Sequence, residues 1–261
     1  MRTFKNILKI LFIAFVLSVS IFLLWMSNRY TVPIMMYHNV EDIDHHEANW
    51  VSPDSFNMHM KFLSDNEYNV ITLEAFVEMT RTGATFPRKT VVLTFDDAYT
   101  NNYENALPIL KTYNFPAMLF VPTDRVGTDN HLTWSQIEEM KNSGIFTIGS
   151  HGLEGGYFPG YSIDEQKKQI EVSKKILEQR LGVQVDYIAY PIGGFSESIK
   201  KMVQVSGYRA AVATNRGYDR YNKDLFEINR IRFSNKDNSS VILRVKLSGY
   251  YNMFRKYKHP Y

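Results

Sequence analysis

Short, almost wholly apolar runs alternate with amphipathic stretches along most of this chain, and this pattern constrains the fold more than any other feature. Runs of this kind are typical of strands buried on both faces of a sheet. The predicted strands are Val32–Tyr37, Asn69–Thr72, Thr90–Phe95, Ala117–Val121, Phe146–Ile148, Tyr187–Tyr190, Ala210–Ala213 and Glu227–Ile231. The predicted helices are Asp54–Asn66, Leu73–Thr82, Asn101–Tyr113, Thr133–Asn142, Ile163–Leu181 and Glu197–Ser206. A strand followed by a helix, repeated about seven times, predicts an α/β protein with a parallel barrel or open sheet.

The helix predicted at Ile163–Leu181 has the clearest boundaries. Ser162 and Glu165 have the spacing of a capping box at its start. Gly182 stands where a helix C-terminus favours glycine. This segment should therefore form one of the long covering helices of the sheet.

The N-terminal segment has the pattern of a membrane signal-anchor. Arg2, Lys5 and Lys9 precede the run Ile10–Met26, which carries no charge. Such a run reaches the lower length limit of a membrane span, and a flanking lysine extends it by snorkelling. The positive leader predicts that residues 1–30 hold the chain in a bacterial cell membrane as a single pass, with the remainder extracytoplasmic. A cleaved signal peptide is the alternative.

Composition bounds the rest of the chain. Its 261 residues, 44% of them hydrophobic, suit one large domain, which we assign to residues 31–261. The chain has no cysteine, which excludes structural disulfides, thiolate catalysis and cysteine-type zinc sites. A net charge of +3, spread evenly, gives no argument for nucleic acid, and we expect none as a partner.

Polar side chains follow several predicted strands at the point where each strand ends. They are His38, Asp96, Asp97, His151 and the pair Tyr190-Pro191. Because the carboxyl ends of parallel strands meet at one mouth of a barrel, all of these residues should face the same side.

The adjacent carboxylates Asp96 and Asp97 are costly after a buried strand unless their charges are used. In one interpretation, Asp97 and His151 bind a divalent ion, and Asp96 is the base for a water that the ion activates. In the other, the two aspartates cap the next helix near Thr100 and Asn101. The spacing alone leaves both interpretations open.

The stretch TFDDAY resembles the first motif of the NodB-type polysaccharide deacetylases, carbohydrate esterase family 4. The other resembling stretches, in chain order, are VPIMMYHNV, FNMHMKFLSDNEYNVITLEAF, FPRKTVVLTFDDAY, LPILKTYNFPAMLFVPT, LTWSQIEEMKNSG, IGSHG, EVSKKILEQRLGVQVDYIAYPIGGF and INRIRF. The first of them, VPIMMYHNV, looks like the opening strand of the family branch that de-N-acetylates poly-N-acetylglucosamine-like chains. The resemblance covers residues 31–235 and implies a distorted (β/α)7 barrel.

The resemblance implies a role for individual residues. Asp96 matches the catalytic base, Asp97 and His151 match metal ligands, and the backbone N–H of Ile192 matches the donor to the oxyanion. The implied reaction is metal-assisted hydrolysis of an N-acetyl amide on an amino-sugar polysaccharide, either poly-N-acetylglucosamine-like or peptidoglycan. Zinc is the expected metal, and cobalt, nickel or iron also suit such ligands.

One part of the family pattern is missing. The second motif places another histidine four or five residues after the first, where this chain has Gly155 and Gly156. Three explanations stay open. Glu154 or His38 completes the site, or the metal is held by two side chains and water, or catalysis and the metal are lost. In the third case the protein is a glycan-binding or polysaccharide-biosynthesis accessory protein, so whether it is an enzyme also stays open.

Further residues are predicted around the mouth. Those expected to line a substrate groove are Tyr190, Pro191 and Trp134. Arg230 and Arg232 alternate along a predicted strand and therefore point the same way, so either of them is a candidate partner that keeps Asp96 ionised.

Overall fold

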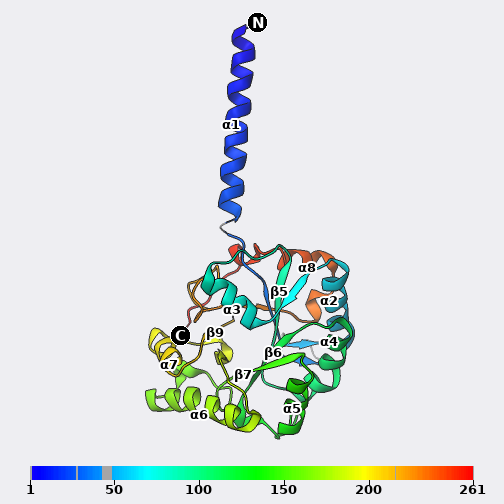
Figure 1. Ribbon diagram of the computed structural model, residues 1–261, viewed down its shortest axis with the longest axis vertical. Helices are drawn as coiled ribbons and strands as arrows, with labels where there is room; N and C mark the ends of the chain where they lie inside the picture. Colours follow the sequence, from blue (N-terminus) through cyan, green and yellow to red (C-terminus); the bar gives the residue numbers. More distant parts are fainter. Residues whose placement is uncertain (1, 28, 43–48, 215, 261) are drawn as a thin grey trace.

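The computed structural model describes residues 2–27, 29–42, 49–214 and 216–260. Its longest helix, α1 (Arg2–Ser27), projects away from the rest of the protein (Figure 1). Within the described residues, the stretch Lys9–Ser27 is the one helix long and apolar enough to cross a membrane, and none of it is buried in the protein.

The chain enters the folded domain directly beneath α1, where it meets its own C-terminal segment. The Thr31 N–H donates a hydrogen bond to the Gly249 carbonyl over 2.8 Å. The Tyr30 ring packs edge-on against Tyr250, with ring centroids 6.0 Å apart. The chain at Gly249 and Tyr250 therefore lies on the face of the domain from which α1 emerges (Figure 1), and the C-terminal segment, residues 249–260, runs from there to Phe195, whose N–H donates to the Pro260 carbonyl.

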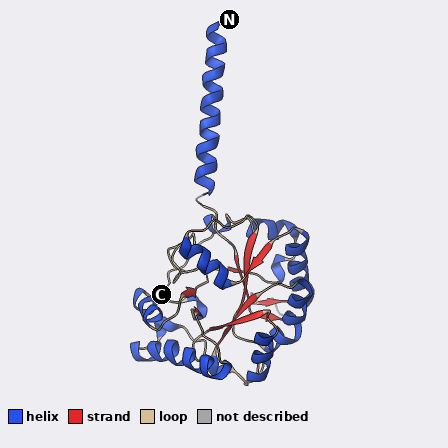
Figure 2. Cartoon of the chain, in the orientation of Figure 1, coloured by secondary structure: helices blue, strands red, loops and turns tan. Residues whose placement is uncertain are grey.

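The centre of the domain is a parallel sheet that curls into an incomplete barrel (Figure 2). Its strands are β1 (Ile34–Tyr37), β4 (Asn69–Ile71), β5 (Thr90–Phe95), β6 (Ala117–Val121), β7 (Phe146–Ser150), β8 (Tyr187–Ala189), β9 (Ala210–Val212) and β10 (Ile231–Arg232). The order is β10-β1-β5-β6-β7-β8-β9, and β4 also pairs with β5. Every one of these pairings is parallel, which confirms the predicted sheet. A separate parallel pair joins β2 (Asn39–Val40) to β3 (Trp50–Val51).

The gap between β9 and β10 is bridged by irregular chain. The Ala211 N–H donates to the Leu225 carbonyl, and the Ala213 N–H donates to the Ile228 carbonyl. The prediction of one strand over Glu227–Ile231 was therefore wrong in its extent. Its first part makes an isolated bridge to β9, and regular pairing with β1 begins only at Ile231.

Helices cover the outside of the curled sheet (Figures 1 and 2). They are α2 (Pro53–Asp65), α4 (Leu107–Tyr113), α5 (Trp134–Asn142), α6 (Ile163–Leu181), α7 (Glu197–Val205) and α8 (Ser240–Lys246). Helix α3 (Leu73–Thr82) instead packs against residues on the inner face of the sheet. The predicted helix at Asn101–Tyr113 begins as a π-turn, Asn102–Ala106, before α4. The capping box predicted at Ser162 is half-formed, since the Ser162 hydroxyl accepts from the Glu165 N–H without a reciprocal bond. Helix α8 was not predicted.

Each face of the sheet contributes to a separate cluster of buried apolar side chains. Met35, Tyr37 and Phe95 pack outward against the covering helices in the larger apolar cluster. Ile34 and Phe120 point inward and join α3 in the smaller cluster. Because successive residues of a strand alternate between faces, this division also decides which residues at the strand ends turn toward the inside of the barrel.

His59 on α2 is completely buried in the outer layer. One ring nitrogen lies 3.0 Å from the Tyr37 hydroxyl oxygen and the other lies 3.0 Å from the Asp237 carbonyl oxygen. Burial lowers the pKa of His59 from 6.5 to about 4. The folded protein therefore holds this ring neutral at a pH where the unfolded chain protonates it.

This difference makes stability depend on pH. The contribution of neutral His59 is complete above pH 6.5 and is lost as the pH falls toward 4. The free energy of unfolding should fall by about 3 kcal/mol over this range because of His59 alone. Denaturant unfolding of the full chain in a neutral detergent should show a flatter pH profile for His59→Gln than for the parent. His131→Gln is the control and should keep the parental profile. Identical pH profiles for His59→Gln and the parent would contradict this account.

Candidate active site

Four polar side chains meet at the carboxyl edge of the sheet, as predicted. His38 follows β1, Asp96 and Asp97 follow β5, and His151 follows β7. The His38 Nε2 lies 3.9 Å from Asp96 Oδ2, and the His151 Nε2 lies 3.5 Å from Asp97 Oδ1. Neither aspartate caps the next helical segment, whose N-cap residue, Asn101, is without a side-chain cap bond.

Asp96 is paired with Arg230 inside the barrel. The two guanidinium NH groups donate to Asp96 Oδ1 over 2.6 Å and to Oδ2 over 2.7 Å. The arginine is fully buried, and its Nε donates to the Ala213 carbonyl over 2.9 Å. Of the two arginines that the sequence offered, Arg230 is therefore the partner, and Arg232 forms no ion pair with the described residues.

This pair keeps Asp96 ionised. Burial by itself raises the pKa of the carboxyl, but the charge of Arg230 and its hydrogen bonds outweigh burial and lower the pKa from 3.8 to about 2. Bidentate arginine–carboxylate bonds are strong and directional, so they also fix the orientation of the carboxylate. Asp96 is thus a permanent anion at the mouth.

The orientation of His151 is set by its backbone surroundings. Its Nδ1 lies 2.9 Å from the Ala189 carbonyl oxygen, and its own N–H donates to the Val121 carbonyl. A carbonyl oxygen only accepts hydrogen bonds, so Nδ1 carries the proton of the neutral ring and Nε2 presents a lone pair to Asp97. A backbone bond of this kind is how metal-ligating histidines are usually held.

Asp97 and His151 fit two adjacent ligands of one divalent ion. Zinc binds nitrogen and oxygen ligands at about 2.0–2.2 Å in tetrahedral geometry, which separates two ligand atoms by roughly 3.4 Å. The observed separation of Asp97 Oδ1 from His151 Nε2 is 3.5 Å. No cluster of three or more histidine or acidic side chains suitable for a metal occurs among the described residues. Among the residues that the structure describes, Asp97 and His151 are therefore the two side chains placed as such ligands.

The loop after His151 explains where a third ligand would stand. A Cβ built on Gly155 would lie 3.9 Å from Asp97 Oδ1 and 4.0 Å from His151 Cδ2, so this position faces the pair. A Cβ on Gly156 would collide with the Tyr161 hydroxyl at 1.7 Å. Of the two glycines, Gly155 therefore occupies the place from which a side chain would reach Asp97 and His151.

The two side chains predicted as substitutes for the missing ligand have other neighbours. The Glu154 carboxylate accepts from the Tyr161 hydroxyl over 2.7 Å and from Gln169 Nε2 over 3.4 Å. His38 lies on the Asp96 side of the cluster, and its buried Nδ1 has no hydrogen-bond partner in the described structure. Both therefore stay untested as ligands.

The turn Pro191–Gly193 after β8 presents a strained residue. Ile192 has a φ of 57°, and its side chain is 61% exposed. A positive φ is a true outlier for a β-branched residue, and such strain gathers at functional sites. No acceptor for the Ile192 N–H lies among the described residues, while its carbonyl accepts from Arg216 Nε over 3.1 Å. Its geometry is that of a fixed backbone donor at the mouth.

The predicted groove residues are placed differently. Tyr190 is fully buried, because its ring stacks on Phe195 and its hydroxyl donates to the Phe226 carbonyl over 3.1 Å. Pro191 is buried as well, so the prediction that these two side chains line an open groove was wrong. Trp134 packs against the outer core, with the Arg180 guanidinium over its ring.

Sequence reasoning missed the residues that shape the loop after His151. Gln169 Oε1 accepts from the Leu153 N–H over 2.8 Å, and the Tyr161 hydroxyl fills the space beside Gly156. The signal available for Gln169 is its polar character on the core-facing stripe of α6, which also holds Ile170 and Leu177; Gln169 is 1% exposed. A residue of this kind on a core-facing stripe predicts a buried hydrogen bond.

A curled parallel sheet with this cluster at its carboxyl edge is the NodB-like class of fold. Residues 83–211 match the family model described as "Polysaccharide deacetylase". YxkH of Bacillus subtilis, a polysaccharide deacetylase by name, is 32% identical over 203 residues, which span 78% of this chain and 71% of YxkH. The chain belongs to the polysaccharide deacetylase family.

Two further proteins resemble this chain. The poly-beta-1,6-N-acetyl-D-glucosamine N-deacetylase of Staphylococcus epidermidis is 27% identical over 198 residues, which span 71% of this chain and 68% of that enzyme. The structure of the Streptococcus pyogenes deacetylase PplD in complex with acetate superposes with a TM-score of 0.75 at 28% identity. That superposition covers 83% of this chain and 97% of PplD.

Replacing the strained isoleucine tests the backbone geometry of the turn. Ile192→Gly should raise the free energy of unfolding by about 0.5–1 kcal/mol, because relief of the positive φ exceeds the entropy that glycine adds to the unfolded chain. Ile163→Gly is the matched control, since Ile163 is also an exposed isoleucine but begins a regular helix. It should lower the free energy of unfolding by about 1 kcal/mol. Denaturant unfolding measures both, and a destabilised Ile192→Gly would show that the turn carries no strain.

Breaking the buried ion pair should be far more damaging than breaking a surface pair. Arg230→Met leaves the Asp96 carboxylate buried without a cation and should lower the free energy of unfolding by about 3–5 kcal/mol. Arg81→Met removes the exposed pair with Glu78 and should cost less than about 1 kcal/mol. Denaturant unfolding of both variants checks this. Combining Arg230→Met with Asp96→Asn should recover part of the loss, and strictly additive effects would exclude the pairing.

Proposed function

We propose that this protein is a membrane-anchored, extracytoplasmic hydrolase that removes N-acetyl groups from an amino-sugar polysaccharide. The observation that carries the proposal is the convergence of the Asp96–Arg230 pair and the Asp97–His151 pair at one mouth. Burying an ionised carboxylate beside two oriented metal-type ligands costs folding free energy, and a chemical role accounts for keeping such an arrangement. Helix α1, which is long and apolar enough to cross a membrane, supports the envelope location.

Each residue of the mouth has a chemical task in this proposal. Asp97 and His151 would hold a divalent ion, zinc by preference, which supplies Lewis-acid activation of water and of the acetamido carbonyl. Asp96 takes the proton from the attacking water. The Ile192 N–H donates a hydrogen bond to the oxygen that becomes negative as the tetrahedral centre forms.

The family and its relatives support the proposed substrate class. The Staphylococcus epidermidis relative is named for poly-beta-1,6-N-acetyl-D-glucosamine, which supports a poly-N-acetylglucosamine-like polymer as the substrate here. Peptidoglycan presents the same acetamido group on a different backbone and is the second substrate to assay.

The second candidate function is glycan binding without hydrolysis, in which the protein serves as an accessory in polysaccharide biosynthesis. It is favoured by one observation, the glycine at position 155 facing a pair that lacks a third ligand. A mouth that has lost its metal would keep the shape of the groove and its affinity for the polymer.

Zinc titration and acetate release separate these functions. The full chain in a neutral detergent should bind zinc, and Asp97→Ala should abolish this binding. Gly155→His should raise the zinc affinity by at least about tenfold by adding the third ligand, despite the strain of a positive φ at that position. Acetate release from N-acetylglucosamine oligomers should be slow in the parent, absent in Asp97→Ala and faster in Gly155→His.

Gly156→His is the matched control, because Tyr161 already fills that space. It should gain neither zinc affinity nor activity. If neither the parent nor Gly155→His binds zinc or releases acetate, the hydrolase proposal fails. Measurable affinity of the parent for the same oligomers would then support the accessory function.

A further inference from the structure

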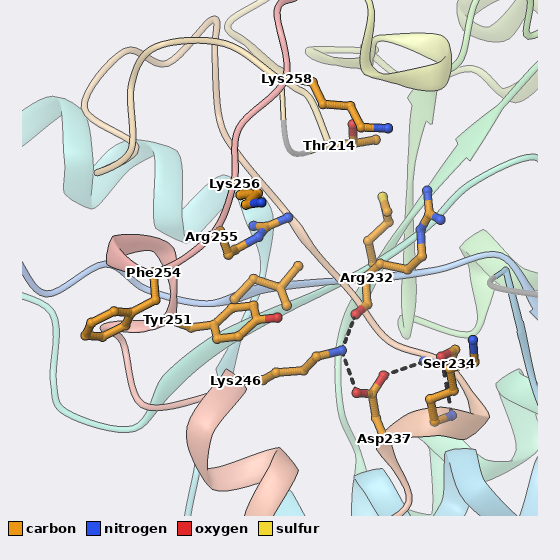
Figure 3. Close-up of a pocket in the computed structure, with 13 residues that line it drawn as sticks. Thr214, Arg232, Ser234, Asp237, Lys246, Tyr251, Phe254, Arg255, Lys256 and Lys258 are labelled. Carbon is orange, nitrogen blue, oxygen red and sulfur yellow. Dashed lines mark hydrogen bonds and ion pairs between the residues drawn. The ribbon is translucent and has the colours of Figure 1, made fainter.

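A basic pocket lies beside the mouth, formed by β10, α8 and the C-terminal segment (Figure 3). It has a volume of about 560 Å³. Its basic lining residues are Arg232, Lys236, Lys246, Arg255, Lys256 and Lys258, and Asp237 is the one acid among the described residues that line it. None of these residues belongs to the cluster of Asp96, Asp97 and His151.

The single carboxylate of the basic pocket is already fully used. Asp237 Oδ1 lies 2.5 Å from Lys246 Nζ, and its Oδ2 accepts from the Ser234 N–H over 2.8 Å (Figure 3). In the described structure Arg232, Lys236 and Lys258 form no ion pair, and all three are exposed. The pocket therefore holds a surplus of positive charge.

This surplus is unfavourable in the absence of an anion. Burial, together with neighbouring cations, lowers the pKa of Lys246 and of Arg255, although Asp237 partly offsets the effect at Lys246. Like charges held in a partly buried space repel one another, and a bound anion relieves this repulsion. Guanidinium and ammonium groups together match the oxygens of a phosphate group, and the volume leaves room for the sugar or glycerol that carries it.

The basic pocket adjoins the catalytic mouth through direct contacts. The Arg255 guanidinium donates to the carbonyl of Arg230, the residue that pairs with Asp96, over 2.9 Å. The backbone of Lys258 forms an isolated parallel β-bridge with that of Arg216. The Arg216 Nε in turn donates to the Ile192 carbonyl over 3.1 Å. A polymer that crosses the mouth would therefore reach the pocket with a neighbouring unit of its chain.

We propose that the basic pocket binds a phosphate group carried by the polysaccharide itself, so that the substrate is a phosphodiester-containing amino-sugar polymer rather than a neutral one. This inference rests on the proposed function for the identity of the polymer. A phospholipid headgroup offers the same chemistry, but the contacts with Arg230 and Arg216 connect the pocket to the mouth and favour the polymer.

Calorimetry on the full chain in an uncharged detergent tests this assignment with a glycerol phosphate oligomer and with inorganic phosphate as probes. The pocket variant carries Arg232→Gln, Lys236→Gln and Lys258→Gln. The charge-matched control carries Arg88→Gln, Lys111→Gln and Lys201→Gln, which are exposed and outside the pocket. The pocket variant should lose at least about tenfold in affinity for the oligomer, and the control less than about twofold.

Two results would overturn the assignment. Equal losses in the pocket variant and the control would mean that the probe responds only to overall charge. Tighter binding of short-chain dihexanoyl phosphatidylglycerol than of the oligomer, dependent on the same three residues, would make the pocket a lipid headgroup site.

The outcome is separable from that of the proposed function. Oligomer binding requires no hydrolysis, and acetate release from neutral oligomers requires no pocket. If oligomer binding is lost only in the pocket variant and the parent releases no acetate, the phosphate-site proposal stands and the hydrolase proposal fails. If the parent releases acetate but binds neither phosphate probe, the hydrolase proposal stands and the phosphate-site proposal fails.

Discussion

The buried pair of Asp96 and Arg230 is the interaction on which the mouth depends. It joins the end of β5 to the chain that closes the barrel beside β9, so it ties together segments far apart in sequence. Removing charges from water costs several kcal/mol per ion, which only bidentate geometry and further hydrogen bonds repay. Arg230 meets this requirement, since its Nε and both NH groups have partners. The same ion pair thus closes the barrel and keeps Asp96 ionised within it.

Three residues that follow the strands at the mouth have left-handed backbone geometry. Asp97 and Ala98 have φ values of 70° and 54°, and Ile192 has a φ of 57°. Left-handed geometry costs a non-glycine residue roughly 1–2 kcal/mol, so three such residues at one mouth are sustained by the surrounding packing. The reversal after Phe95 turns Asp96 inward to Arg230 while Asp97 faces His151. Two adjacent carboxylates thereby serve different partners.

Much of this fold was readable from local pattern, and the limits have physical causes. β5 and α6 have the predicted boundaries, because a mostly apolar run of β-formers and a capped amphipathic run leave little choice. The positions of Asp96, Asp97 and His151 at one edge followed from parallel topology. The sequence could not show which of two equivalently placed side chains makes a contact. A period of two puts Arg230 and Arg232 on the same face, and only the contacts of the folded chain decide between them.

The C-terminal segment changes the electrostatics of the mouth in a way that no local pattern indicated. Deacetylation turns a neutral acetamido group into an ammonium ion, and the surplus positive charge of the basic pocket lies beside the place where that ion would form. Charges repel over about 10 Å at moderate ionic strength, so a neutral polymer would become less well bound with every unit converted. A polymer that brings its own phosphate to the pocket neutralises this repulsion. Under the proposed phosphate assignment, the same arrangement that disfavours a purely cationic product therefore favours an anionic chain.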